Sequence, residues 1–318
     1  MFVIHPLFKV YPYANKSKKI INICVESEQN TEQTRFPLNK KSGPLKTPHL
    51  KVLKSWNSIN TNNQRIHLLK ASVLHMKIRD SLQGNIAAAK AAILKAAKQK
   101  PALIALPEYF TVPNCMADFT DASSISKETC KETLNFLQEM SKQIGDIYLL
   151  GGSVLEEDNG KYYNTSTLWK NGSLLAKYKK INLIQAEIKA GVAKGTQPLV
   201  VNTEIGKIGL LVCADTFDPD LVKCTADLGA EIISLPVAAM GTHPTVKGHP
   251  LTEQIARDYG LFLLKVGNVC SSMRGGRSAI IAPWGILGEV TDAPEHSILT
   301  RDLDMQRLRE YRSKLSKS

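Results

Sequence analysis

One stretch constrains this chain more than any other. Residues 208–219 read I-G-L-L-V-C-A-D-T-F-D-P, an apolar run that ends on Cys213 and then turns polar. Such a run is typical of a strand buried on both faces in the interior of an α/β sheet. Asp218 followed by Pro219 indicates a helix start, because Asp caps the first amide groups and Pro fits the first helical turn. We therefore predict a strand, an elbow at Cys213 and a helix.

The elbow gives Cys213 two interpretations. A side chain there lies at the carboxyl edge of the sheet, where open α/β sheets bind ligands, and nearby helix N-terminal amides favour a thiolate or an oxyanion. Free cysteine is also among the most buried residue types and then acts as a small hydrophobic residue. A base and a cation at the same sheet edge would favour the nucleophile over the core residue.

The rest of the chain alternates predicted helices with predicted strands or strand pairs, which indicates the α/β class. Asn171-Gly172 is typical of a two-residue type I′ hairpin turn, so the strands on either side of it are expected to be antiparallel. The expected strands are 65–75, 102–106, 147–155, 162–170, 173–178, 198–202, 207–212, 231–236, 261–268, 278–282 and 286–290, and the expected helices are 85–99, 126–145, 218–229, 251–259 and one from Arg301.

The N-terminal residues differ in composition from the rest. Residues 1–64 are rich in Asn, Lys, Ser and Thr with scattered prolines, which predicts a poorly ordered basic extension. A transit peptide and a misassigned start codon are alternative explanations. The formal charge of the chain is +12, but residues 1–65 carry +8 of it, so residues 66–318 are only mildly basic. No Lys/Arg stripe interleaved with aromatics occurs there, which argues against nucleic-acid binding.

Other motifs that would imply cofactors or membranes are missing from the sequence. The six cysteines include no pair closer than eleven residues, so no metal knuckle is expected. No phosphate-binding glycine motif occurs, and we expect no cofactor. Neither a signal-peptide core nor a run of about 18 apolar residues is present. We expect a cytoplasmic protein with free thiols and no membrane association.

Two further side chains follow predicted strands. Glu108 comes directly after the strand 102–106, and Lys180 follows the strand 173–178. Taken singly, Glu108 is a solvated turn residue and Lys180 one member of a basic run. Taken with Cys213, they supply a base, a cation and a nucleophile at strand ends, where active sites of α/β proteins form.

At these positions the chain resembles the carbon–nitrogen hydrolase (nitrilase) superfamily, over about residues 65–305, with 306–318 left as a charged tail. The motifs are L-P-E at 106–108, Y-K-K-I-N-L at 178–183 and G-L-L-V-C-A-D at 209–215, in the order of that family. The resemblance implies a four-layer αββα sandwich and homodimers or higher homo-oligomers. It also implies that Glu108 is the general base, Lys180 the oxyanion stabiliser and Cys213 the nucleophile.

The same resemblance suggests further site residues and a reaction. A second glutamate is expected a few residues past the lysine, and Glu187 fits better than Glu204. The backbone N–H of Ala214 is a candidate oxyanion donor. The sequence Cys213-Ala214-Asp215 is similar to the amidase-like branch, which favours hydrolysis of small amides or carbamoyl compounds through a thioester. A nitrile hydrolase and a catalytically silent binding protein of the same fold are the alternatives.

One departure from the family pattern concerns substrate recognition. Phe217 occupies a position where many members that act on small amides carry Arg. A substrate carboxylate would need another partner, and Lys265 or Arg274 would supply one only if the fold turns its side chain inward.

Overall fold

The computed structural model describes residues 68–114, 121–238, 249–270, 277–290 and 295–317. All of them belong to one compact unit, Asn62–Ser318. The predicted extension 1–64 and Arg274 lie outside the described residues.

Among the described residues, the first sheet has seven strands in the order β10-β1-β2-β3-β4-β5, with β13 also paired to β1. β1 runs parallel to β2 and β10 and antiparallel to β13. The strands are β1 (Leu68–Lys77), β2 (Leu103–Ala105), β3 (Tyr148–Asp158), β4 (Lys161–Lys170), β5 (Ser173–Lys179), β10 (Asn268–Val269) and β13 (Ser297–Asp304).

The second sheet, within the same described ranges, has six strands in the order β12-β11-β9-β8-β7-β6. Its central strands β7, β8 and β9 are parallel, so their carboxyl ends share one edge. The strands are β6 (Leu199–Thr203), β7 (Gly206–Leu210), β8 (Ile232–Pro236), β9 (Phe262–Val266), β11 (Ser278–Ala282) and β12 (Gly285–Val290).

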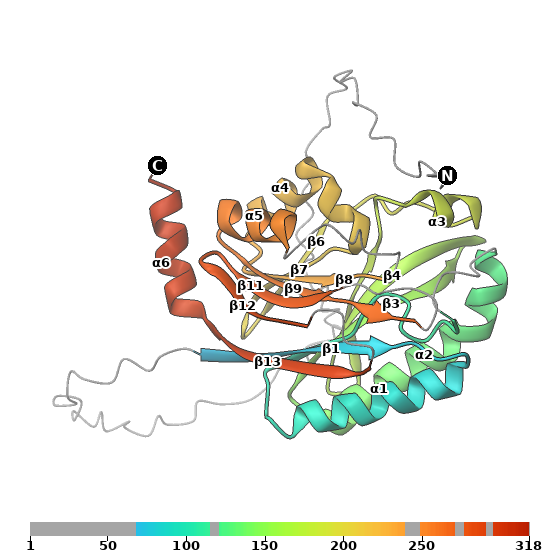
Figure 1. Cartoon of the computed structure of the whole chain (residues 1–318). Coiled ribbons are helices and arrows are strands. Elements are labelled where there is room, and N and C mark those ends of the chain that lie inside the picture. Colours follow the sequence, from blue (N-terminus) through green and yellow to red (C-terminus); the bar gives the residue numbers. More distant parts are fainter. Residues whose placement is uncertain (1–67, 115–120, 239–248, 271–276, 291–294, 318) are drawn as a thin grey trace, which may run out of the picture. The chain divides into compact units, whose positions relative to one another are not determined.

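Helices cover the outer faces of the two sheets (Figure 1). On the first sheet, Leu74 and Ile104 pack with Ile93 of α1 and Leu137 of α2. On the second, α5 packs on β9, β11 and β12. The helices are α1 (Leu82–Ala97), α2 (Ala122–Ile144), α3 (Gln185–Lys189), α4 (Pro219–Asp227), α5 (Pro250–Tyr259) and α6 (Met305–Leu315), with a 3₁₀ turn η2 (Cys213–Phe217) before α4.

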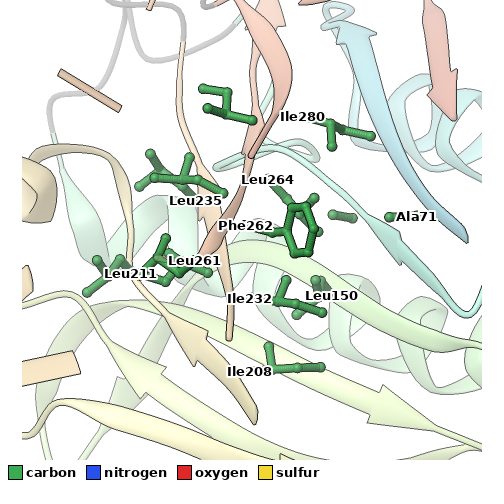
Figure 2. Packing of buried hydrophobic residues seen from close by; sticks show 14 of the residues in the cluster. Ala71, Leu150, Ile208, Leu211, Ile232, Leu235, Leu261, Phe262, Leu264 and Ile280 are labelled. Atoms are coloured by element: carbon green, nitrogen blue, oxygen red, sulfur yellow. The ribbon is translucent and has the colours of Figure 1, made fainter. Parts of the chain in front are cut away.

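The inner faces of the sheets form the largest apolar core. Ala71 and Leu150 of the first sheet lie beside Phe262 and Ile232 of the second, all of them buried (Figure 2). The alternation of side chains along each strand accounts for this arrangement, since every second residue faces the opposite sheet and the others face helices. The expected α/β architecture with four αββα layers is confirmed.

The structure confirms the hairpin that was predicted at Asn171-Gly172. Asn171 and Gly172 both have positive φ, +51° and +76°, as a type I′ turn requires, and β4 and β5 are antiparallel.

The predicted helix from Arg301 is wrong in its start, because residues up to Asp304 belong to β13 and α6 begins at Met305. The charged residues suggested a solvated helix, but the first four of them, 301–304, pair with β1. No described helix is long and apolar enough to cross a membrane.

Candidate active site

Glu108 lies in the turn that follows β2, and the residue is 1% exposed. The turn packs against β3, where a Cβ at Gly152 would lie 2.0 Å from the Pro107 carbonyl oxygen. Glycine fits there for a second reason, since the φ of Gly152 is +58°. The Glu108 carbonyl accepts a 2.8 Å hydrogen bond from Asn268 Nδ2 of β10. Neighbouring strands therefore fix the backbone that carries the carboxylate.

Lys180 follows β5 directly and is also 1% exposed. Its Nζ lies 2.9 Å from Glu108 Oε1 and 2.9 Å from Glu187 Oε2. Glu187 is on α3 and is fully buried. One buried ammonium thus contacts two buried carboxylates, and the three groups together carry a net charge of −1 when all are ionised.

Asn164 of β4 joins the two carboxylates. Its Nδ2 donates hydrogen bonds of 2.8 Å to Glu108 Oε1 and 2.7 Å to Glu187 Oε1. Its main-chain carbonyl accepts the Lys180 N–H at 2.8 Å. An amide nitrogen that donates to a carboxylate favours the ionised form of that carboxylate. We refer to Glu108, Asn164, Lys180 and Glu187 as the carboxylate cluster.

Three more donors complete the hydrogen bonding of this cluster. Tyr109 Oη donates to Glu187 Oε1 at 2.9 Å, and the Ala238 N–H donates to Glu108 Oε2 at 2.7 Å. The Ile184 N–H donates to Glu187 Oε2 at 3.0 Å. Each carboxylate is therefore held on both of its oxygens, which fixes its orientation before any substrate binds.

Cys213 is the first residue of η2, just beyond β7. Its φ is +47°, in the left-handed region that costs a non-glycine residue about 1–2 kcal/mol. After η2, Asp218 caps α4 by accepting hydrogen bonds of 3.1 Å from the Asp220 and Leu221 N–H groups. The predicted elbow and helix cap are thus confirmed. Strain of this kind persists where the surrounding structure enforces it.

Hydrogen bonds to Asp215 hold the elbow at Cys213 in this conformation. Its carboxylate accepts hydrogen bonds of 2.8 Å from the Val212 N–H, from Tyr178 Oη and from the Asn182 N–H. Val212 precedes the cysteine, whereas Tyr178 and Asn182 each lie two residues from Lys180. One buried aspartate therefore ties the elbow to the segment that carries the lysine, which explains the pairing of these two sequence motifs.

The charges within the site act on one another. Burial raises the pKa of Glu108, and Lys180 offsets part of this effect. Burial, together with the Glu108 carboxylate, raises the pKa of the Cys213 thiol to about 12. Burial lowers the pKa of Lys180, but Glu108, Cys213 and Glu187 outweigh burial and raise it above its ordinary value. At neutral pH the thiol is therefore protonated and the lysine charged, so the thiol must lose its proton as it attacks.

The structure brings the predicted residues Glu108, Lys180, Glu187 and Cys213 together. The alternative second glutamate, Glu204, contacts Tyr148 and Lys170 elsewhere, and its side chain is 59% exposed. The catalytic roles of the four residues stay predictions.

The remaining predicted residues have different environments. Ala214 is buried in η2 directly after the cysteine. Phe217 is 75% exposed, whereas Lys265 is partly buried and contacts His249. Sequence reasoning missed Asn164, and the available signal was a polar residue at the start of the buried run of β4.

The described part of the chain contains no group of three or more His, Cys, Asp or Glu side chains that could hold a metal ion. Cys213 is a free thiol, but Cys270 is in a disulfide, so the prediction of free thiols is wrong for that residue.

Comparisons with known proteins agree with this geometry. Residues 70–313 match the family described as Carbon-nitrogen hydrolase. Omega-amidase NIT2 of Mus musculus is 28% identical over 261 residues, covering 77% of this chain and 92% of that protein. Nitrilase homolog 2 of Dictyostelium discoideum is 29% identical over 318 residues, covering 92% and 93%.

Solved structures show the same fold. Nit3 of Saccharomyces cerevisiae, a member of the nitrilase superfamily, superposes with a TM-score of 0.68 at 24% identity, covering 78% of this chain and 94% of that one. The NitN amidase of Nesterenkonia sp. AN1 gives 0.66 at 26% identity, covering 78% and 98%. In a mutant of that amidase, acrylamide has added to the active-site cysteine.

Proposed function

We propose a specific reaction for this chain, which belongs to the carbon–nitrogen hydrolase family: the hydrolysis of small amides or carbamoyl compounds through a Glu108–Lys180–Cys213 triad and a thioester. The observation that carries this proposal is the position of Lys180. It contacts two buried carboxylates, and its charge interacts with the thiol at the strained elbow.

The first half of the reaction forms the thioester. Cys213 Sγ attacks the amide carbon while its proton passes to Glu108, which is positioned as general base by Asn164 and the Ala238 N–H. The negative charge that develops on the amide oxygen is stabilised by Lys180 and the Ala214 N–H. The C–N bond then breaks, and the leaving nitrogen takes the proton from Glu108 and departs as ammonia or an amine.

The second half releases the acid. Glu108, ionised again, removes a proton from a water molecule as its oxygen attacks the thioester carbon. The C–S bond breaks, and the Cys213 sulfur recovers a proton from Glu108. Glu187 holds the Lys180 ammonium in place throughout both halves and keeps it charged.

The preference for amides over nitriles rests on Cys213-Ala214-Asp215 and on the relatives named as amidases. The presence of all three triad residues argues against a catalytically silent binding protein. We also propose a homodimer or higher oligomer, as the resemblance implies, and a cytoplasmic location. Light scattering of the purified chain and imaging of a tagged chain in cells test these two points.

A substrate panel tests the proposed reaction. The purified protein is incubated with ω-amides of dicarboxylic acids, N-carbamoyl amino acids, aliphatic amides and nitriles, and ammonia release is measured. We expect turnover of at least one amide or carbamoyl compound. Turnover of nitriles with every amide inert would contradict the branch, and no turnover of any compound would favour the silent protein.

A further inference from the structure

Tyr109 directly follows Glu108 and has a backbone conformation that is unfavourable for its side chain. Its φ is +50°, in the left-handed region where glycine and asparagine are common and a bulky aromatic residue is rare. The backbone N–H donates to the Ser153 carbonyl at 3.1 Å, so β3 holds the turn in this conformation. Strained residues of this kind gather at functional sites. An aromatic side chain at this position therefore indicates a contribution that glycine could not make.

The hydroxyl group of Tyr109 distinguishes it from a purely apolar core residue. The residue is buried, and a phenylalanine would fill the same space without a polar atom to satisfy. Tyr109 Oη donates to Glu187 Oε1 at 2.9 Å. Burial raises the pKa of Tyr109 well above its ordinary value, and the charges of Glu187 and Glu108 raise it further. The phenol is therefore protonated at neutral pH and remains a donor.

The ring of Tyr109 is linked to the same carboxylate by packing. It belongs to an apolar cluster with Ala190 and Val192, which follow α3. The Val192 N–H donates to the Glu187 carbonyl at 2.9 Å, which joins this segment to α3. A helix of five residues depends on such contacts, because it is too short to be stable alone. The tyrosine thus supports both the carboxylate and the helix that carries it.

The hydroxyl differs from the other donors to Glu187 Oε1. Asn164 Nδ2 donates to this oxygen at 2.7 Å and Lys180 Nζ at 3.1 Å. Both nitrogens also donate to Glu108 Oε1, so the two carboxylates share them. A phenol has one hydrogen to donate, and Tyr109 donates it to Glu187. This bond is therefore independent of any change in the charge of Glu108.

We propose that Tyr109 is a positioning residue, which acts through Glu187 to hold the Lys180 ammonium at the substrate oxygen while Glu108 carries the thiol proton. The inference rests on the proposed function, because it assigns Lys180 to the oxyanion. With the proton bound, Glu108 is neutral and attracts the ammonium less, so Glu187 becomes the main counter-charge. If that carboxylate lost its orientation, Lys180 would move away from the oxygen. The unshared hydroxyl prevents this movement.

The kinetic test compares Tyr109→Phe, which removes only the hydroxyl group, with Tyr162→Phe as the matched control. Tyr162 Oη also forms a hydrogen bond of 2.9 Å, but to Ser123 Oγ, and its ring packs against the same apolar cluster. On the best amide of the substrate panel, we expect Tyr109→Phe to lower kcat by about 10- to 30-fold, the effect of one hydrogen bond to a charged group, and to change KM by less than about twofold. Tyr162→Phe is expected to change both constants by less than about twofold. A raised KM with unchanged kcat in Tyr109→Phe would overturn the proposal.

A double-mutant cycle tests whether the effect passes through Glu187. Glu187→Gln removes the charge that the hydroxyl group orients. Added to Glu187→Gln, we therefore expect Tyr109→Phe to lower kcat by less than about twofold more. Losses that multiply in the double variant, as those of independent residues do, would contradict a role through this carboxylate.

Alkylation of Cys213 separates this inference from the proposed function, because it requires no turnover. The thiol must again lose its proton beside Lys180, whose charge favours the thiolate. Mass spectrometry after iodoacetamide treatment gives the labelling rates of Cys213 and, as the internal control, of Cys224 on α4. We expect Tyr109→Phe to slow labelling of Cys213 by about fivefold and to leave that of Cys224 unchanged. A slower rate at Cys213 alone supports the positioning role even if no amide of the panel is hydrolysed, and an unchanged rate overturns it even if amides are hydrolysed.

Discussion

Two lysines of this molecule have different surroundings: Lys180 lies in the carboxylate cluster, and Lys265 of β9 lies beside His249. In the first, one ammonium contacts two carboxylates, and a shared amide fixes both. In the second, the ammonium contacts a neutral imidazole, and Arg277 adds further positive charge. The first needs nothing from a substrate to reach its working geometry, as catalysis by preorganised charges requires. In the described part of the chain, neither Glu289 nor Glu253 forms an ion pair with the second ammonium.

The largest expected effect comes from removing the predicted nucleophile. Cys213→Ala eliminates the nucleophile, so we expect hydrolysis to fall by at least about 1,000-fold, to the background rate. Cys224→Ala, on α4, is the control and is expected to retain activity. Ammonia release and melting curves of both variants provide the measurement. Substantial turnover by a folded Cys213→Ala variant would refute the assignment of the nucleophile.

A smaller loss is expected within the carboxylate cluster. Glu187→Gln keeps the shape of the side chain but leaves Lys180 with one charged partner, so we expect kcat to fall by about 100-fold. Glu204→Gln, at the exposed alternative position, is expected to change kcat by less than about twofold. Steady-state kinetics on one amide compare the two variants. Similar effects of the two changes would show that the buried glutamate has no special role.

The smallest expected change is in the pH dependence of kcat/KM, which reports on the ionisation of Glu108. Glu108 must be ionised to act as a base, so kcat/KM falls as the pH drops through its raised pKa. Asn164→Asp replaces a donor by a third negative charge and raises that pKa further, so we expect the acid limb to move to higher pH by about 1 unit.

Lys265→Met is the comparison for this pH profile, and we expect it to leave the acid limb in place. The measurement is kcat/KM for pentanamide against pH in both variants, since that substrate has no carboxylate. An unshifted limb in Asn164→Asp would mean that Asn164 does not control the ionisation of Glu108.

The triad positions were predictable because each lies where an apolar strand turns polar, which is a local signal. Cys213, Glu108 and Lys180 all carry that signal, whereas Glu187 was expected only from the resemblance to the family. The predicted elbow was confirmed because Asp218 and Pro219 form a helix start of known type. The role of the extension 1–64 stays a prediction.

Other features depend on contacts between distant residues, which a single sequence does not reveal. Asn164 reaches Glu108 across 56 positions of sequence, and β13 pairs with a strand near the start of the fold. The contact of Lys265 with His249 depends on the register of β9 and on where α5 begins. The local sequence pattern does not specify the register of β9 or the start of α5. A one-residue shift of register would move a side chain to the other face of the sheet.

The pairing of β13 with β1 has a consequence for synthesis. Leu68 pairs with Asp304 and His75 with Ser297, so this partner of β1 leaves the ribosome more than 200 residues after β1 itself. Until then β1 presents an open edge that other chains can join, and the first sheet lacks one of its strands. We expect the nascent chain to complete this sheet only after β13 has been synthesised, and newly made protein to depend on chaperones more than the finished fold does.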